Sequence, residues 1–105
     1  MMPGMEEFEF TAELWEHSGP GSWHFVTVPF EVSEDIREVS GPPGGFGSVR
    51  VEVRVGSSTW LTSVFPDKSS GCFVLPVKKQ VRAAEALEAG DELALVLGVV
   101  GGDGA

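Results

Sequence analysis

Cysteine, tyrosine and basic side chains are scarce in this sequence. The single cysteine, Cys72, excludes an intrachain disulfide and fits a reducing compartment. Seven lysines and arginines oppose 16 aspartates and glutamates, so the net charge is −9, which disfavours general binding to nucleic-acid phosphates. No apolar run approaches the roughly 20 residues of a membrane span, and residues 1–7 lack the basic flank and apolar stretch of a secretory signal. We therefore expect a cytoplasmic protein with no membrane segment.

The length of 105 residues suits one domain. We expect residues 1–7 to form a flexible N-terminus, residues 8–97 to form a single folded domain, and the glycine-rich residues 98–105 to form a flexible tail. The charge is uneven, because residues 1–40 carry nine acids and one base whereas residues 41–105 carry seven acids and six bases. Solubility is the simplest explanation for the acidic half, and an acidic binding face is the alternative.

Alternating apolar and polar residues, broken by glycine and proline, predict a mostly β chain. Val49–Val55 shows the clearest alternation, with four valines on one face and charged residues on the other. The dipeptide Gly56-Ser57 that follows suits a type II′ hairpin. The predicted strands are Phe8–Leu14, Trp23–Val28, Val49–Val55, Ser58–Phe65, Gly71–Leu75 and Glu92–Leu97.

Two short helices are predicted between these strands. Ser33 is a suitable N-cap for the first, over Ser33–Val39, which would pack through Ile36 and Val39. The second spans about Val77–Leu87. Its apolar residues share one helical face, and a glycine follows as a stop signal: Val77, Val81, Ala84 and Leu87, then Gly90.

The predicted elements repeat in the same order in the two halves of the chain. Residues 23–55 and residues 71–97 both read strand, proline, helix, glycine, strand, with Val28-Pro29 matching Leu75-Pro76. Because such units are stabilised by packing on one another, we expect a small closed or split barrel of about six strands. It would have a pseudo-two-fold axis and a short helix capping each end.

Several spaced motifs resemble the bacterial DUF1905 family, a domain of unknown function, over about Phe8–Leu97. The motifs are Trp23-x-Phe25-Val26-x-x-Pro29, Phe46-Gly47, Trp60-x-Thr62-Ser63, Leu75-Pro76-Val77-Lys78-Lys79-x-Val81-Arg82 and Gly90-Asp91. The resemblance implies a double-split β-barrel akin to AbrB-like regulators and MazE-like antitoxins, here complete as a monomer because both halves lie in one chain. It brings no established activity. The run Ala83–Ala89 departs from the family's usual glycine-leucine helix end.

A cluster of cations is the main candidate site. Lys78, Lys79 and Arg82 fall within five residues, near a helix start where the helix dipole disfavours cations. They could bind an anion, or they could pair with the acidic N-terminal half. Trp60 is added as a candidate wall of a small pocket in the barrel mouth, whereas Trp23 is expected in the core.

These residues favour a non-enzymatic module that binds a small anionic ligand or an acidic protein partner. A DNA-binding, antitoxin-like regulator is the alternative, by fold analogy alone. No catalytic constellation and no cofactor motif is evident, and His17, His24 and Cys72 lack the spacing of metal ligands. Trp15 lies on the polar side of its predicted strand and could mark an interface.

Overall fold

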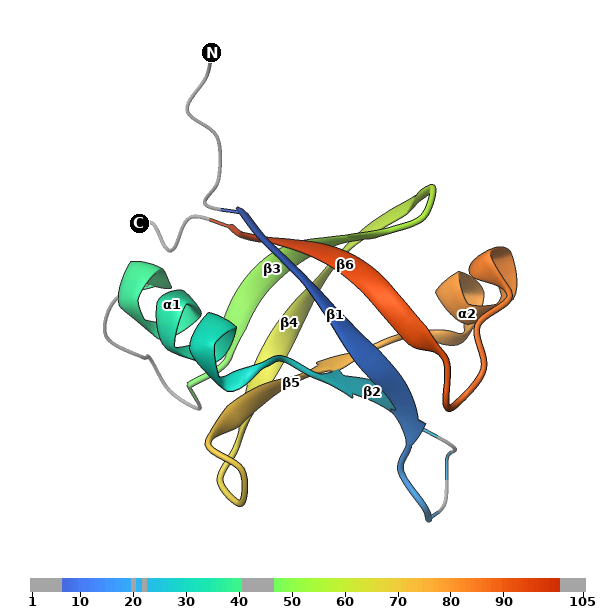
Figure 1. The fold of residues 1–105 in the computed structure, drawn as a ribbon, viewed down its shortest axis with the longest axis horizontal. Helices are drawn as coiled ribbons and strands as arrows, with labels where there is room; N and C mark the ends of the chain where they lie inside the picture. The colour runs from blue at the N-terminus through green and yellow to red at the C-terminus, as the bar shows by residue number, and fades with distance from the viewer. Residues whose placement is uncertain (1–6, 20, 22, 41–46, 101–105) are drawn as a thin grey trace.

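The computed structural model describes residues 7–19, 21, 23–40 and 47–100. In this part of the chain, six strands form a closed antiparallel barrel in the order β1-β2-β5-β4-β3-β6, with two helices at opposite sides (Figure 1). The elements are β1 (Glu7–Glu16), β2 (His24–Thr27), α1 (Phe30–Ser40), β3 (Val49–Val55), β4 (Ser58–Asp67), β5 (Cys72–Pro76), α2 (Lys79–Glu85) and β6 (Glu92–Val99). The mostly β, six-strand barrel predicted from the sequence is confirmed.

The strand pairing contains the predicted pseudo-two-fold symmetry. If β1 is exchanged with β4, β2 with β5 and β3 with β6, the same six pairings result. The two halves are therefore β1-β2-α1-β3 and β4-β5-α2-β6. They meet along the ladders between β2 and β5 and between β3 and β6, which close the barrel and leave no strand without two neighbours.

Hydrogen bonds across β2 and β5 show which residues are equivalent, and they correct the predicted alignment. The amide of Val28 donates to the carbonyl of Phe73, and the amide of Val77 donates to the carbonyl of His24. The pseudo-two-fold axis relates these two bonds to each other. Val28 therefore corresponds to Val77, and His24 to Phe73, with 49 residues between the members of each pair. The prolines that we matched, at positions 29 and 76, are consequently not equivalent, because one follows the shared valine and the other precedes it.

Alternation along the strands builds the core. Leu14 and Val26 face each other across β1 and β2, and both are fully buried. From β3, three of the four valines predicted to face inward are buried, and Val49 is half-buried. The remaining buried apolar residues are Val28, Ile36, Trp60, Val64, Phe73, Leu75, Val77, Val81, Leu93, Leu95, Leu97 and Val99. No helix in the described ranges is long and apolar enough to cross a membrane.

The outer ends of the domain extend beyond our boundaries. Glu7 begins β1, although we placed it in the N-terminus, because it lies opposite Gly98 in the β1–β6 ladder. β6 in turn continues through Gly98 and Val99, which we placed in the tail, and both are buried. Val100 follows β6 and donates its amide to the carbonyl of Arg50. The other residues of the predicted flexible ends, 1–6 and 101–105, lie outside the described residues.

β4 runs through Pro66 to Asp67, two residues beyond its predicted end. Pro66 lies opposite Phe73, whereas the flanking Phe65 and Asp67 direct their backbone groups toward β5. The missing N–H of Pro66 therefore points to the other side of β4, beyond the end of β3, where no ladder bond is lost. This placement explains why the proline does not stop the strand.

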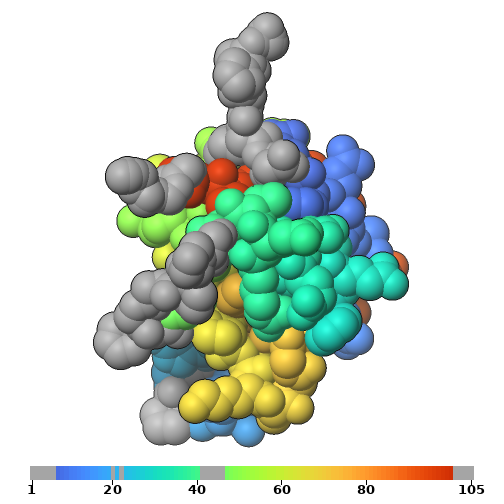
Figure 2. Space-filling model, turned by 90° about the vertical axis from the view of Figure 1, so that its left-hand side faces the viewer, coloured from blue at the N-terminus to red at the C-terminus, as the bar shows by residue number. Residues whose placement is uncertain are grey.

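Helix α1 begins at Phe30, three residues before the predicted start, so Ser33 is not its N-cap. The amide of Ser33 donates to the carbonyl of Pro29, which closes the first helical turn. Ser33 is instead fully buried, and α1 lies across one side of the barrel with β1 and the β4–β5 hairpin beside it (Figure 2). Ile36 is buried as predicted, whereas Val39 is 43% exposed and does not pack as we expected.

Helix α2 ends at Glu85, because Ala86 adopts the left-handed conformation with φ 56° and ψ 49°. The amide of Ala86 donates to the carbonyl of Ala83, and the amide of Leu87 donates to the carbonyl of Arg82. These are the two bonds of a Schellman motif, which usually carries glycine at the position of Ala86. The predicted stop, Gly90, lies in the following turn, and Ala84 is exposed instead of packed.

Replacing Ala86 by glycine is expected to stabilise the domain by about 0.5–1 kcal/mol. An alanine in the left-handed region costs roughly 1–2 kcal/mol, and the extra freedom of glycine in the unfolded chain offsets part of the gain. Urea unfolding followed by tryptophan fluorescence measures the difference. The control is Ala83→Gly, an exposed position inside the same helix, where the same change should destabilise by about 1 kcal/mol. Equal losses in the two variants would contradict the assignment of the motif.

Candidate functional site

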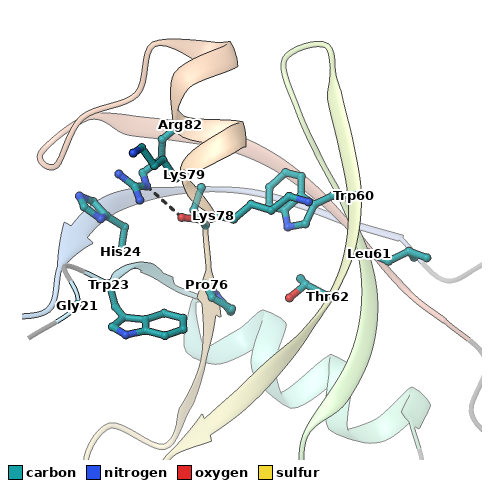
Figure 3. Close-up of a pocket in the computed structure, with 11 residues that line it drawn as sticks. Gly21, Trp23, His24, Trp60, Leu61, Thr62, Pro76, Lys78, Lys79 and Arg82 are labelled. Carbon is teal, nitrogen blue, oxygen red and sulfur yellow. Dashed lines mark hydrogen bonds between the residues drawn. The ribbon is translucent and has the colours of Figure 1, made fainter.

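A pocket of about 380 Å³ opens between β4 and the end of β5, beside α2 (Figure 3). Its walls come from the segment before β2, the middle of β4, and the turn from β5 into α2. The described residues that line it are Gly21, Trp23, His24, Trp60, Leu61, Thr62, Pro76, Val77, Lys78, Lys79 and Arg82. All four candidate residues from the sequence, Lys78, Lys79, Arg82 and Trp60, therefore lie around one cavity.

The pocket exists because the β4–β5 ladder stops early. The last pair toward the pocket joins Phe65 to Val74. The amide of Val77 donates to β2, so by alternation the N–H at position 76 would point to β4. Position 76 is a proline and has no N–H to give. The β4–β5 ladder of the closed barrel therefore ends at this point, and the gap that it leaves between the two strands is called the split below.

The cations reach the pocket from the start of α2. Lys78 and Lys79 are exposed, and Arg82 is half-buried. Nε of Arg82 donates to the carbonyl of Val77 over 3.2 Å, which orients the guanidinium beside the opening (Figure 3). Among the described residues, no carboxylate forms an ion pair with Lys78, Lys79 or Arg82. The salt bridge in this part of the chain joins two other residues, Arg37 and Glu34. The pairing with the acidic half that we considered is therefore not seen there.

Arg82 occupies the position that Ser33 holds in the other half of the barrel. Each stands five residues after its equivalent valine, and each side chain donates to that valine's carbonyl: Ser33 Oγ to Val28 and Arg82 Nε to Val77. Ser33 is short and fully buried, so it lies between α1 and the barrel. The longer arginine makes the same bond and still extends to the surface. The same position of the repeat thus holds a buried packing residue, Ser33, in the first half and a charged surface residue, Arg82, in the second.

Two tryptophans form the aromatic part of the lining. Trp60 is only 8% exposed and faces inward with Val64 on β4. Trp23 is 57% exposed, so our placement of it in the core is wrong. Trp23 directly precedes β2. It lies two residues from Phe25 and so points to the same face of the strand, whereas Val26 and Val28 point into the barrel. Trp23 therefore stacks on the outer face of the barrel against Phe25, with ring centroids 6.3 Å apart.

Trp15 lies outside the pocket and is half-buried instead of exposed. Its indole N–H donates to Oγ1 of Thr27 over 3.0 Å, and its ring packs on Phe25 at 5.1 Å. Because its N–H is already hydrogen-bonded to Thr27 and its ring contacts Phe25, Trp15 packs against the barrel. The interface that we considered for it gains no support.

Asp67, at the end of β4, lies outside the described lining of the pocket. The pKa of Asp67 is lowered because the hydroxyls of Ser70 and Ser69 donate to its carboxylate, and this group lies at the β4–β5 turn. No three histidines, cysteines or acids in the described ranges come together as a metal site. The chemistry that the described pocket offers is positive charge next to indole and aliphatic surface.

Sequence reasoning identified four of the eleven described lining residues, Lys78, Lys79, Arg82 and Trp60. The cations are neighbours along the chain, so their clustering is visible without a structure. Trp23, His24 and Thr62 were missed as lining residues, because they come from segments distant in sequence. One signal was available for Trp23: counting alternation backward from Val26 and Val28 places position 23 on the outer face.

The sequence was also compared with known proteins. A family model for a domain of unknown function, DUF1905, matches residues 10–97. No curated protein matches the chain. The matched range begins within β1 and ends within β6, so it contains both halves of the barrel and every described residue of the pocket.

Proposed function

The chain belongs to the DUF1905 family, whose description assigns no activity, and we propose from the pocket itself that this domain is a non-enzymatic module that binds a small anion. The observation that carries the proposal is the charge of the lining. Three cations, Lys78, Lys79 and Arg82, border the cavity, and none of its described residues is an acid. The whole chain has a net charge of −9, so this local excess of positive charge runs against its composition.

Charge placed in this way attracts anions. A cleft lined by one sign of charge concentrates the field and raises the local concentration of the opposite ion. Arg82 is the best-oriented member, because its Nε donates to the Val77 carbonyl. A guanidinium held in this way can offer its two terminal nitrogens to an anion in a forked, bidentate contact. Lys79 lies three residues before it, on an adjacent part of the same helix, and adds a second point charge.

The absence of a visible catalytic arrangement supports a binding role. Thr62 is the sole hydroxyl among the described lining residues, and within them no base forms a hydrogen bond with it. A nucleophile normally needs such a base within reach. The proposal therefore assigns recognition, without a chemical step, to this pocket.

Charge reversal at Lys79 is expected to weaken anion binding by at least 10-fold, since a hydrogen bond to a charged group contributes about 1.5–3 kcal/mol. The measurement is the increase in melting temperature, and then calorimetric titration, with phosphate, sulfate and small carboxylates at low salt. The control is Lys68→Glu, an exposed lysine outside the lining that carries the same change in net charge. If no anion stabilises the wild type, or if both variants lose binding equally, the proposal is wrong.

An acidic protein segment is a second candidate, favoured by the open edge of β4. The two-residue hairpin pairs Val55 with Ser58, so alternation directs the backbone groups of Leu61 and Ser63 away from β3 and toward the split. An extended peptide could add to this edge, with its acids near the cations. Binding of an acidic peptide that competes with phosphate would favour this candidate, and independent binding of the two would oppose it.

The DNA-binding, antitoxin-like alternative rests on the resemblance to AbrB- and MazE-like folds alone. The net charge of −9 opposes it, since phosphate contacts dominate affinity for DNA. A gel shift with random duplex at low salt decides the matter, because nonspecific binding is strongest under that condition. A retarded band that disappears in Lys79→Glu would support the alternative, and unshifted DNA would remove it.

A further inference from the structure

We propose that the ligand of this pocket is an aromatic anion, whose flat ring lies against the indoles of Trp23 and Trp60 while its acidic group lies among Lys79 and Arg82. This inference rests on the anion site proposed above and specifies the part of the ligand that the cations do not contact. It applies equally to an aryl phosphate and to an aryl carboxylate, which share the same two-part chemistry.

The size of the cavity is the first reason. About 380 Å³ is within the range of roughly 300–1,000 Å³ that is usual for organic ligands. An inorganic anion would contact the cations and leave most of that space to water. Much of the remaining lining is apolar, with Trp60, Leu61 and Pro76 among its members. A ligand that fills the pocket therefore needs an apolar body in addition to its charge.

The arrangement of the lining is the second reason. Arg82 and Lys79 extend from α2 on one side, whereas Trp60 comes from β4 on another and Trp23 lies below, near Pro76 (Figure 3). Lys79 and Arg82 thus lie on another side of the cavity from the two indoles, whereas Lys78 extends toward Trp60 (Figure 3). A molecule with its charge at one end and a ring at the other can contact both sets at once.

The surroundings of Trp23 are the third reason. Although this ring is 57% exposed, it has neighbours that restrict where it can lie. It stacks on Phe25 with an interplanar angle of 15°. On another side, Gly21 approaches so closely that a Cβ there would lie 2.9 Å from Nε1 of the indole, and Gly21 itself has a φ of +100°. A ring whose positions are restricted by its neighbours loses less entropy when a ligand stacks on its exposed face.

The experiment compares pairs of anions that differ only by a ring: phenyl phosphate with inorganic phosphate, and benzoate with acetate. Calorimetry gives each affinity for the full chain. Fluorescence gives a second readout, because the chain has three tryptophans and no tyrosine. Trp15→Phe removes the indole outside the pocket and should leave quenching intact. Trp23→Ala removes an exposed ring and so tests the site without disturbing the core, whereas Trp60→Phe tests the buried wall.

We expect phenyl phosphate to bind about 10-fold more tightly than phosphate, a typical gain for stacking on an aromatic side chain. In Trp23→Ala this preference should fall to near unity while the affinity for phosphate stays unchanged. If wild type binds phosphate and phenyl phosphate equally, the anion site stands and the aromatic inference is overturned. If neither member of either pair binds, the proposed function fails and this inference fails with it. A preference that persists undiminished in Trp23→Ala also overturns it, whatever Trp60→Phe does.

Discussion

Replacing Ile36 by alanine is expected to lower the free energy of unfolding by about 3 kcal/mol, which is typical for loss of a large aliphatic side chain from a packed core. Ile36 is fully buried, and it is the one apolar side chain of α1 that is buried. Val32 of the same helix is half-buried and packs against the core as well, but Ile36 is inserted most deeply. The loss of three side-chain carbons should therefore leave a cavity beneath α1 that the strands cannot fill.

Val39→Ala is the matched control for this prediction. Val39 was expected from the sequence to pack beside Ile36, but it is 43% exposed. Its truncation should cost less than about 0.5 kcal/mol, as is usual for a surface position. Urea unfolding gives both values from the shift in midpoint at an unchanged slope. Similar losses in the two variants would mean that α1 packs through both residues, contrary to the structure.

Ser33→Ala is expected to destabilise the domain by about 2 kcal/mol, although it removes a single oxygen atom. Ser33 Oγ donates to the carbonyl of Val28 over 3.2 Å and accepts from the amide of Phe73 over 3.0 Å. The Oγ and the Phe73 amide lie in the buried interior, out of reach of water. Without the hydroxyl, the Phe73 N–H loses its acceptor, and an unsatisfied buried donor costs about 1–3 kcal/mol.

A second serine of the same helix provides the comparison. Ser40 Oγ donates to the carbonyl of Arg37 at the end of α1, over 3.3 Å, in a partly buried setting. Ser40→Ala should change stability by less than about 0.5 kcal/mol, because water can replace its hydroxyl. Hydrogen exchange at the Phe73 amide adds a local readout, and it should become faster in Ser33→Ala and not in Ser40→Ala. Unchanged protection of that amide would show that Ser33 does not hold β5.

The strands were the predictable part of this fold. Alternation of valine with charged residues defined β3 from Val49 to Val55 without error, because one face of that strand is wet and the other buried. The repeat was predictable as an order of elements for a similar reason, since each half must bury the same kind of face. A closed barrel follows once both halves lie in one chain and their edges need partners.

Helix ends and registers were less predictable, because tertiary contacts decide them. Ser33 has the side chain of a good N-cap, yet the need to satisfy the Phe73 amide places it inside the barrel. Ala86 ends α2 in a conformation that alanine ordinarily avoids. The repeated prolines suggested an alignment, but the cross-strand bonds of Val28 and Val77 define a different one.

The pocket also combines features that the local sequence shows with features that tertiary contacts decide. Lys78, Lys79 and Arg82 could be read directly, since they are close in sequence and unusual in an acidic chain. The reason that they border a cavity could not be read, because it depends on the direction in which the absent N–H of Pro76 would point. That direction is set by the β2–β5 ladder, which joins segments about 50 residues apart.

The first and last strands of this barrel are neighbours, and this sets the order in which the chain can mature. Glu7 lies opposite Gly98, so the seam between β1 and β6 joins residues from the two ends of the domain. During synthesis, β1 leaves the ribosome long before its partner exists. Leu14 can meet Val26 of β2 early, but Phe8 and Phe10 lie opposite Leu97 and Leu95, which are made only when the domain is almost complete. Such distant pairing slows folding, and it makes completion of the barrel a single late event instead of a gradual accretion.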